Sequence, residues 1–342
     1  MVHVAEGAWL RDVLRHPDLV LAVRRDALAV YHRGASIFLA EFANGRIVPK
    51  THVKYLQRSR QAYASLGDDG SFGLDPAAAI WTRYEGPQTL ADMLRAATSL
   101  AGPEKLGLHA LLVNSPHVVD TEIVLEGGTA TAPGSSSAPD IAEPQSDPAA
   151  TGNPTDERVE IAEAIETADA ASTTTTEAAT IADPVATRLD RLDVATLEEG
   201  QGTIRLVFHE AKHFANKELR AATSRTPPVL EQIARYEATL RRHETRLVAE
   251  YAAVCRALAE LDVLRREVGG AAAPLNPLIR RVADGAALQL DPLPRLVVFG
   301  FDEDQRAGAV WTKHRARLIE ALGSRRLYAV GNTRTKATAA FW

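Results

Sequence analysis

The segment GTIRLVFHEAKHF, residues 202–214, is the most informative part of this 342-residue chain, because it combines an apolar strand with a charged end. The run is short, contains β-branched residues and follows a glycine, which is typical of a buried strand. Residues 109–127 and TRLDRLDVATL, residues 187–197, have the same character and precede it along the chain. The sequence therefore predicts three consecutive strands.

A long helical stretch follows these strands, from Pro228 to about Val268. Pro227 suits a first turn, and Gly269-Gly270 ends the stretch. We expect a break near residues 241–244. The run at residues 294–301 reads as another buried strand, so the helical stretch is a crossover between parallel strands of a mixed sheet. Residues 314–323 and 325–331 predict a final helix and strand.

The N-terminal part has a different pattern, because residues 15–50 read as four short strands. Asn44-Gly45 between the last two is a strong hairpin signal. Residues 88–100 have helical spacing and predict the first helix of the second domain. We therefore expect a β-rich lobe over residues 1–80 and a mixed α/β domain over residues 81–342.

Residues 128–185 predict a disordered insertion in the second domain. The segment has no aromatic residue and cannot bury enough apolar surface to offset its chain entropy. Residues 127–185 hold 11 acidic residues and one basic residue, Arg158, whereas the chain as a whole has a net charge of −5. The remainder is mildly basic, which permits a nucleic-acid partner.

The charged end of the 202–214 strand indicates metal-dependent chemistry. Glu210 and Lys212 are two residues apart, so they project from the same face of a strand. A second carboxylate from the neighbouring strand would complete an oxygen site for a hard divalent cation. Lys212 could then position a water near the metal for attack on a phosphodiester. Gln232 and Tyr236, four residues apart on the following helix, share a face that could look back at this site.

This pattern resembles the PD-(D/E)XK nuclease superfamily, and Gln232 and Tyr236 resemble the QxxxY motif of its RecB-like branch. The resemblance covers residues 85–127 and 186–300 and implies a restriction-endonuclease-like αβββαβ core. It implies that Asp190 and Glu210 bind Mg²⁺ or Mn²⁺, that Lys212 is the catalytic lysine, and that Gln232 and Tyr236 support it. No proline precedes Asp190, a departure from the motif. Asp193 competes with Asp190, but it has the opposite strand parity, so we choose Asp190.

The resemblance implies a Mg²⁺-dependent nuclease that hydrolyses phosphodiester bonds in DNA. Two alternatives remain open. A non-catalytic nucleic-acid or protein-binding module could use the same fold. A zinc metallopeptidase could use His209-Glu210-Ala211-Lys212-His213, which spells H-E-x-x-H, with Glu231 or Glu237 as a third ligand. That motif requires a helix, whereas its context here predicts a strand.

Cellular location follows from what the sequence lacks. Cys255 is the only cysteine, so no internal disulfide is possible, and a reducing compartment fits. The apolar runs are far shorter than a membrane span, and the first residues lack the pattern of a signal peptide. The 32 arginines against 7 lysines are typical of a GC-rich bacterial genome. We expect a cytoplasmic bacterial protein with no membrane partner, and the oligomeric state stays open.

Overall fold

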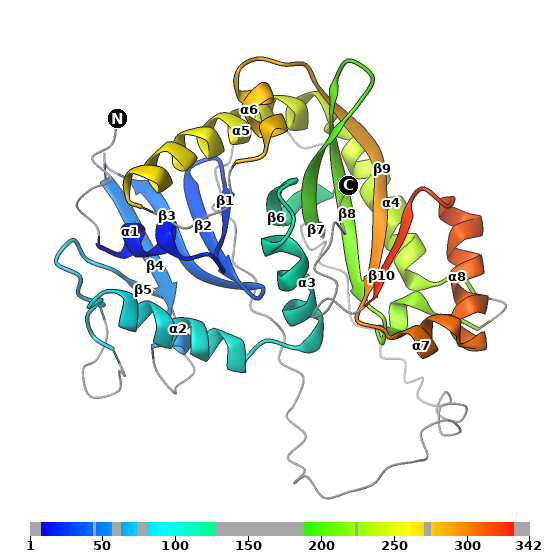
Figure 1. The fold of residues 1–342 in the computed structure, drawn as a ribbon, viewed down its shortest axis with the longest axis horizontal. Helices are drawn as coiled ribbons and strands as arrows, with labels where there is room; N and C mark the ends of the chain where they lie inside the picture. The colour runs from blue at the N-terminus through cyan, green and yellow to red at the C-terminus, as the bar shows by residue number, and fades with distance from the viewer. Residues whose placement is uncertain are drawn as a thin grey trace, which may run out of the picture. The chain divides into compact units, whose positions relative to one another are not determined.

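The computed structural model has a mixed α/β fold with two five-stranded sheets (Figure 1). It describes residues 8–43, 46–56, 63–73, 81–127, 188–222, 225–269 and 275–331, and these contain eight α-helices. The expected disorder of residues 128–185 and the expected turn at Asn44-Gly45 lie outside the described residues. Within the described part, no helix is long and apolar enough to cross a membrane.

The first sheet is an antiparallel meander. Its strands are β1 (Val20–Val23), β2 (Ala27–His32), β3 (Ala35–Ala43), β4 (Arg46–His52) and β5 (Tyr63–Ser65), paired in chain order. The four predicted strands are confirmed, whereas α1 (Ala8–Arg15) was not predicted. The predicted helix at residues 88–100 is also present as α2 (Pro87–Ser99). Its apolar face, including Leu90 and Met93, belongs to the core of the first sheet, so this helix packs with the N-terminal strands.

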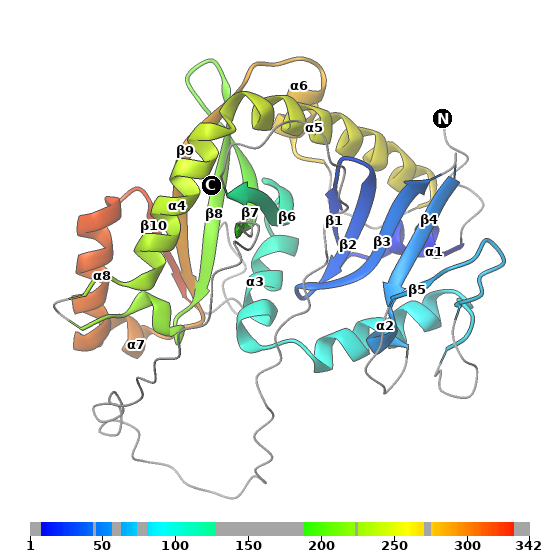
Figure 2. The same ribbon diagram turned by 180° about the vertical axis from the view of Figure 1, so that it is seen from behind.

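The second sheet has the order β10-β9-β8-β7-β6 (Figure 2). Its strands are β6 (Val118–Gly127), β7 (Arg188–Glu199), β8 (Ile204–His213), β9 (Leu288–Phe299) and β10 (Leu327–Gly331). Strands β6, β7 and β8 are antiparallel neighbours, whereas β8, β9 and β10 run parallel. The predicted mixed sheet and its parallel crossover are confirmed.

The helix before β6 corrects one prediction. Residues 109–113 were expected in a strand but form the end of α3 (Pro103–Val113). A short apolar run does not distinguish a strand from a buried helix, and the start signal is Gly102 followed by Pro103 at the first helical position. Helix α3, not α2, is thus the helix that leads into the second sheet and packs on β8.

The predicted long helix is present and breaks where expected. It consists of α4 (Pro228–Arg242) and α5 (Glu244–Glu267), which meet at His243. The helices α6 (Pro277–Ala283), α7 (Glu303–Ala307) and α8 (Ala309–Leu322) complete the fold. Leu206 and Phe208 of β8 share a core with residues of α4, α5 and α6, whereas Ala211 shares a core with α3. The second sheet therefore has helices on both faces.

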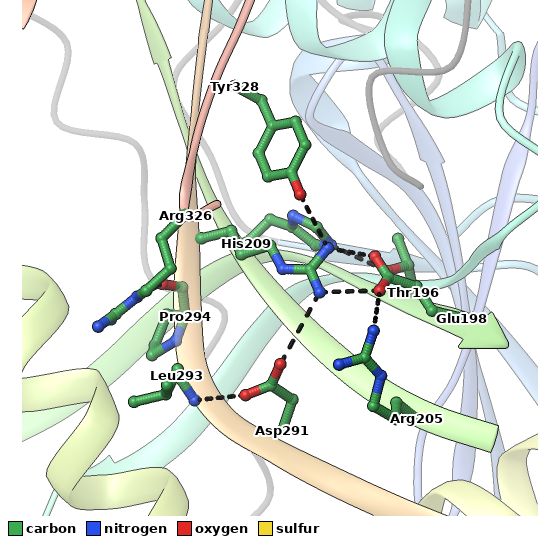
Figure 3. Close-up of polar contacts among 10 residues, drawn as sticks. Thr196, Glu198, Arg205, His209, Asp291, Leu293, Pro294, Arg326 and Tyr328 are labelled. Atoms are coloured by element: carbon green, nitrogen blue, oxygen red, sulfur yellow. Dashed lines mark hydrogen bonds and ion pairs between the residues drawn. The ribbon is translucent and has the colours of Figure 1, made fainter. Parts of the chain in front are cut away.

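A buried ion pair joins β7 to β9 in the second sheet. The Arg295 guanidinium donates to both carboxylate oxygens of Glu198, and each side chain is 8% exposed. Arg205 and the Tyr328 hydroxyl lie beside this pair, as do Thr196 and His209, which are hydrogen-bonded to each other (Figure 3). Since β8 separates β7 from β9, the pair spans three strands and fixes their relative register.

We expect R295M to lower the free energy of unfolding by about 3–5 kcal/mol, because it leaves Glu198 buried without its principal cation. Urea denaturation measures this loss. The exposed pair between Arg281 and the adjacent Glu199 supplies the matched control. R281M should cost less than about 1 kcal/mol. Equal losses in the two variants would contradict a structural role for the buried pair.

Candidate active site

The candidate site lies where β7 and β8 separate. The ladder between them runs from Glu199↔Ile204 to Val194↔His209 and goes no further. Beyond this point the Asp193 carboxylate accepts a hydrogen bond of 2.8 Å from the Ala211 main-chain N–H. A side chain therefore takes the place of a main-chain partner, and an acidic group enters the sheet at its point of separation.

Glu210 and Lys212 belong to β8 and lie next to Asp193 of β7. Their side chains are 3% and 9% exposed, and the Lys212 ammonium is 2.9 Å from Glu210 Oε1. Lys212 is also 2.5 Å from Glu218, which belongs to the 3-10 helix η3 (Lys217–Leu219) directly after β8. Glu210 Oε2 is buried and has no hydrogen-bond partner among the described residues. The predicted Glu210–Lys212 pair is therefore in contact, with one carboxylate oxygen left over.

Burial and mutual repulsion disfavour ionisation of the Asp193 and Glu210 carboxyl groups. Burial raises the pKa of Asp193 to about 6, against the attraction of Lys105, and repulsion from Glu122 adds to the rise. Burial and then the charge of Asp193 raise the pKa of Glu210 well above its usual range. Burial alone would lower the pKa of Lys212, but Glu210 and Glu218 outweigh it and raise that pKa. Such opposed environments are typical of functional sites.

Asp190, which was chosen as the partner of Glu210, contacts helix α4 instead. Its carboxylate accepts a hydrogen bond of 2.9 Å from Thr239 of α4 and lies 3.9 Å from Arg235. Leu192 and Ala195, three residues apart in β7, belong to the same core, so the alternation of faces is interrupted between them. This irregularity invalidates the parity argument and places Asp193, not Asp190, beside Glu210.

Gln232 and Tyr236 meet each other on α4 as expected. The Gln232 amide donates to the Tyr236 hydroxyl over 2.5 Å, and this hydroxyl donates to the Arg191 carbonyl of β7. Burial and then repulsion by the nearby Glu210 charge raise the pKa of Tyr236. The pair thus fastens α4 to β7 close to the carboxyl groups.

Two further charged residues complete the cluster and were missed from the sequence. Lys105 of α3 lies 2.5 Å from Glu122 of β6, whose side chain is 9% exposed. Strands β6 and β7 pair through Thr121↔Val194 and Ile123↔Leu192, so Glu122 stands opposite Asp193. The available signal was the acid within an apolar strand, since a buried charge is rarely present without a partner.

The HEAKH segment lies in strand β8, so it lacks the helical geometry that the zinc pattern requires. His209 bonds to Thr196 over 2.8 Å, whereas the His213 ring packs against Phe299. Their Cα partners in β9 are Arg295 and Phe299, at different levels of the sheet. The two histidines therefore do not face a common ligand.

The donor set at the separation point fits a hard divalent cation. Asp193 and Glu210 supply carboxylate oxygens, which Mg²⁺ and Mn²⁺ prefer, and Glu210 Oε2 is buried without a hydrogen-bond partner among the described residues. Within those residues, no three His, Cys, Asp or Glu side chains form a ready cluster for a metal ion. Water and substrate oxygens would have to complete the coordination, as is usual for Mg²⁺.

Comparisons with family models, curated proteins and solved structures find no match to this chain.

The raised pKa of Asp193 predicts a stability cost at neutral pH. An unfolded aspartate titrates near pH 3.9, so the folded state binds the proton more tightly between about pH 4 and pH 6. The stability that this carboxyl group contributes is present below pH 4 and is lost as the pH rises through this window. In EDTA at pH 8, we expect D193N to raise the melting temperature by about 2–6 °C.

The gain in D193N should shrink to nearly nothing at about pH 3, where this carboxyl group is mostly protonated in both the folded and the unfolded wild type. D190N is the control, since Asp190 lies on the same strand but bonds to Thr239. Thermal unfolding monitored by circular dichroism across this pH range checks the prediction. A gain that is independent of pH, or one that D190N shares, would contradict it.

Proposed function

We propose that this protein is a metal-dependent nuclease that hydrolyses phosphodiester bonds in DNA. The observation that carries the proposal is the pairing of the partly buried Asp193 carboxylate with the buried Glu210 carboxylate, beside Lys212 at the separation of two strands. The element order α3, β6, β7, β8, α4 with α5, and β9 supports a restriction-endonuclease-like αβββαβ core. A cytoplasmic location accords with the single, buried Cys255.

In this proposal Asp193 and Glu210 hold Mg²⁺ or Mn²⁺, and Asp190 is replaced as a ligand. The bound ion would polarise the phosphodiester and lower the pKa of a water molecule. Lys212 forms ion pairs with both Glu210 and Glu218, and these two contacts fix the position of its ammonium group beside the metal-binding carboxyl groups. A positioned ammonium orients the attacking water and stabilises negative charge that develops on the phosphate.

Gln232 and Tyr236 act as support in the same scheme. Their hydrogen bonds to each other and to the Arg191 carbonyl keep α4 against β7. The Arg191 and Arg235 side chains lie on these two elements and are 47% and 38% exposed. Exposed guanidinium groups near the site favour a phosphate-rich substrate.

The decisive experiment is cleavage of linear, circular and single-stranded DNA with Mg²⁺, Mn²⁺ or EDTA. We expect metal-dependent cutting by the wild type. D193N, E210Q and K212A should each lose at least about 100-fold in rate, because the first two remove a charge that holds the metal ion and the third removes the charge that acts on the water and the phosphate. The isosteric D190N is the matched control and should retain most of the activity, because the Asp190 carboxylate bonds to Thr239.

Three outcomes are informative. Loss of cutting in D190N but not in D193N would return the metal site to Asp190. Full activity of K212A in a folded protein would overturn the mechanism. Salt-sensitive DNA binding without any cutting would favour the alternative of a non-catalytic binding module.

A further inference from the structure

The N-terminal lobe touches the candidate site at two points. The first is Arg24, which lies in the turn between β1 and β2. Its guanidinium forms an ion pair with Asp120 and donates to the Thr121 carbonyl over 2.6 Å and to the Glu122 carbonyl over 3.4 Å. One arginine next to the first sheet therefore binds three successive residues of β6.

The segment of β6 that Arg24 binds, residues 120–122, has an unusual backbone conformation. Glu122 has φ +53°, in the left-handed region that residues other than glycine seldom adopt. Such a conformation costs of order 1–3 kcal/mol and persists only where the surroundings enforce it. Arg24 and the hydrogen bond from the Tyr251 hydroxyl to Asp120 supply that enforcement. The strained conformation holds Glu122 opposite Asp193.

The second point is the turn between β2 and β3, which contacts Lys105. Arg33 and Gly34 both have positive φ there, and the Arg33 N–H donates to His109 of α3 over 3.1 Å. A Cβ atom on Gly34 would lie 2.5 Å from Lys105 Cδ, so the Gly34 backbone packs directly on the lysine stem. The first sheet thus holds both partners of the Lys105–Glu122 ion pair.

Two ammonium groups flank a row of three carboxyl groups. Glu122, Asp193 and Glu210 come from the neighbouring strands β6, β7 and β8, and the ammonium groups of Lys105 and Lys212 pair with the outer two. Like charges that face each other across strands are destabilising, so the position of the middle carboxylate depends on the cations beside it. Lys105 attracts Asp193 as well as Glu122.

We propose that the N-terminal lobe is a working part of the site: through Arg24 and Gly34 it holds the Lys105–Glu122 pair against Asp193 and so positions that carboxylate. Arg24, Lys105 and Glu122 are positioning residues, and their effect on the reaction rests on the proposed function. Their effect on Asp193 does not, because the Ala211 N–H bonded to Asp193 reports on it directly.

The test uses the full chain and two matched pairs of variants. R24M removes the ion pair and hydrogen bonds to β6, whereas R25M alters the neighbouring arginine, whose side chain is 95% exposed. G34A forces a Cβ atom against Lys105, whereas G70A introduces a similar strain at φ +79° where a Cβ would approach the Tyr84 carbonyl instead. The glycine pair keeps the proposal testable if R24M fails to fold.

Two readouts are measured for each variant. The first is hydrogen exchange of the Ala211 amide relative to the Phe208 amide, which lies within the regular part of the β7–β8 ladder. The second is the split of the DNA cleavage kinetics into kcat and KM with Mn²⁺. We expect R24M and G34A to speed Ala211 exchange at least fivefold and to lower kcat at least tenfold with little change in KM. R25M and G70A should match the wild type in both.

The outcomes separate the two proposals. Folded R24M and G34A with wild-type Ala211 exchange would overturn the positioning role, whether or not the protein cuts DNA. Faster exchange with an unchanged kcat would overturn the claim that this position matters for the reaction. If the wild type cuts nothing, the nuclease proposal fails, while faster Ala211 exchange in R24M and G34A alone would still support the positioning of Asp193.

Discussion

The hydrogen bond from the Ala211 N–H to the Asp193 carboxylate is the contact on which the arrangement of the site depends. An N–H group within a sheet needs an acceptor, and here the ladder with β7 has already ended. Asp193 satisfies that group and is partly buried in doing so. The Ala211 N–H therefore stays paired where the strands separate, and a carboxylate stands next to Glu210 at this point.

Burial makes the same site a source of instability, although the Ala211 N–H favours the charged form of Asp193. Two carboxyl groups whose pKa values are both raised, one buried and one partly buried, oppose folding at neutral pH, and Lys212 compensates for part of this. The energy must come from the remainder of the sheet, where the Arg295–Glu198 pair and the apolar cores on both faces hold β7, β8 and β9 together. A carboxylate pair kept at such a cost fits a ligand of positive charge.

Periodicity in the sequence was sufficient for most of the second sheet and for the crossover. It also predicted the contact between Glu210 and Lys212 and the contact between Gln232 and Tyr236, because both depend on spacing within one regular element. Periodicity gave the wrong prediction where a strand is irregular. Asp190 was preferred by strand parity, which the irregularity between Leu192 and Ala195 reverses. Lys105 and Glu122 were missed because their contact depends on the packing of α3 beside β6, which spacing along one element does not encode.

These failures share a physical origin that bears on the N-terminal lobe. A regular strand needs only its neighbouring strands and the core of its own sheet, whereas the left-handed Glu122 needs further groups to hold it. Arg24 is such a group, and it belongs to a sheet that has its own core. Since the irregular part of β6 borders the carboxyl groups, support from the first sheet reaches the proposed site of the second. The two sheets are then better understood as one working unit than as a nuclease-like domain with a separate appendage.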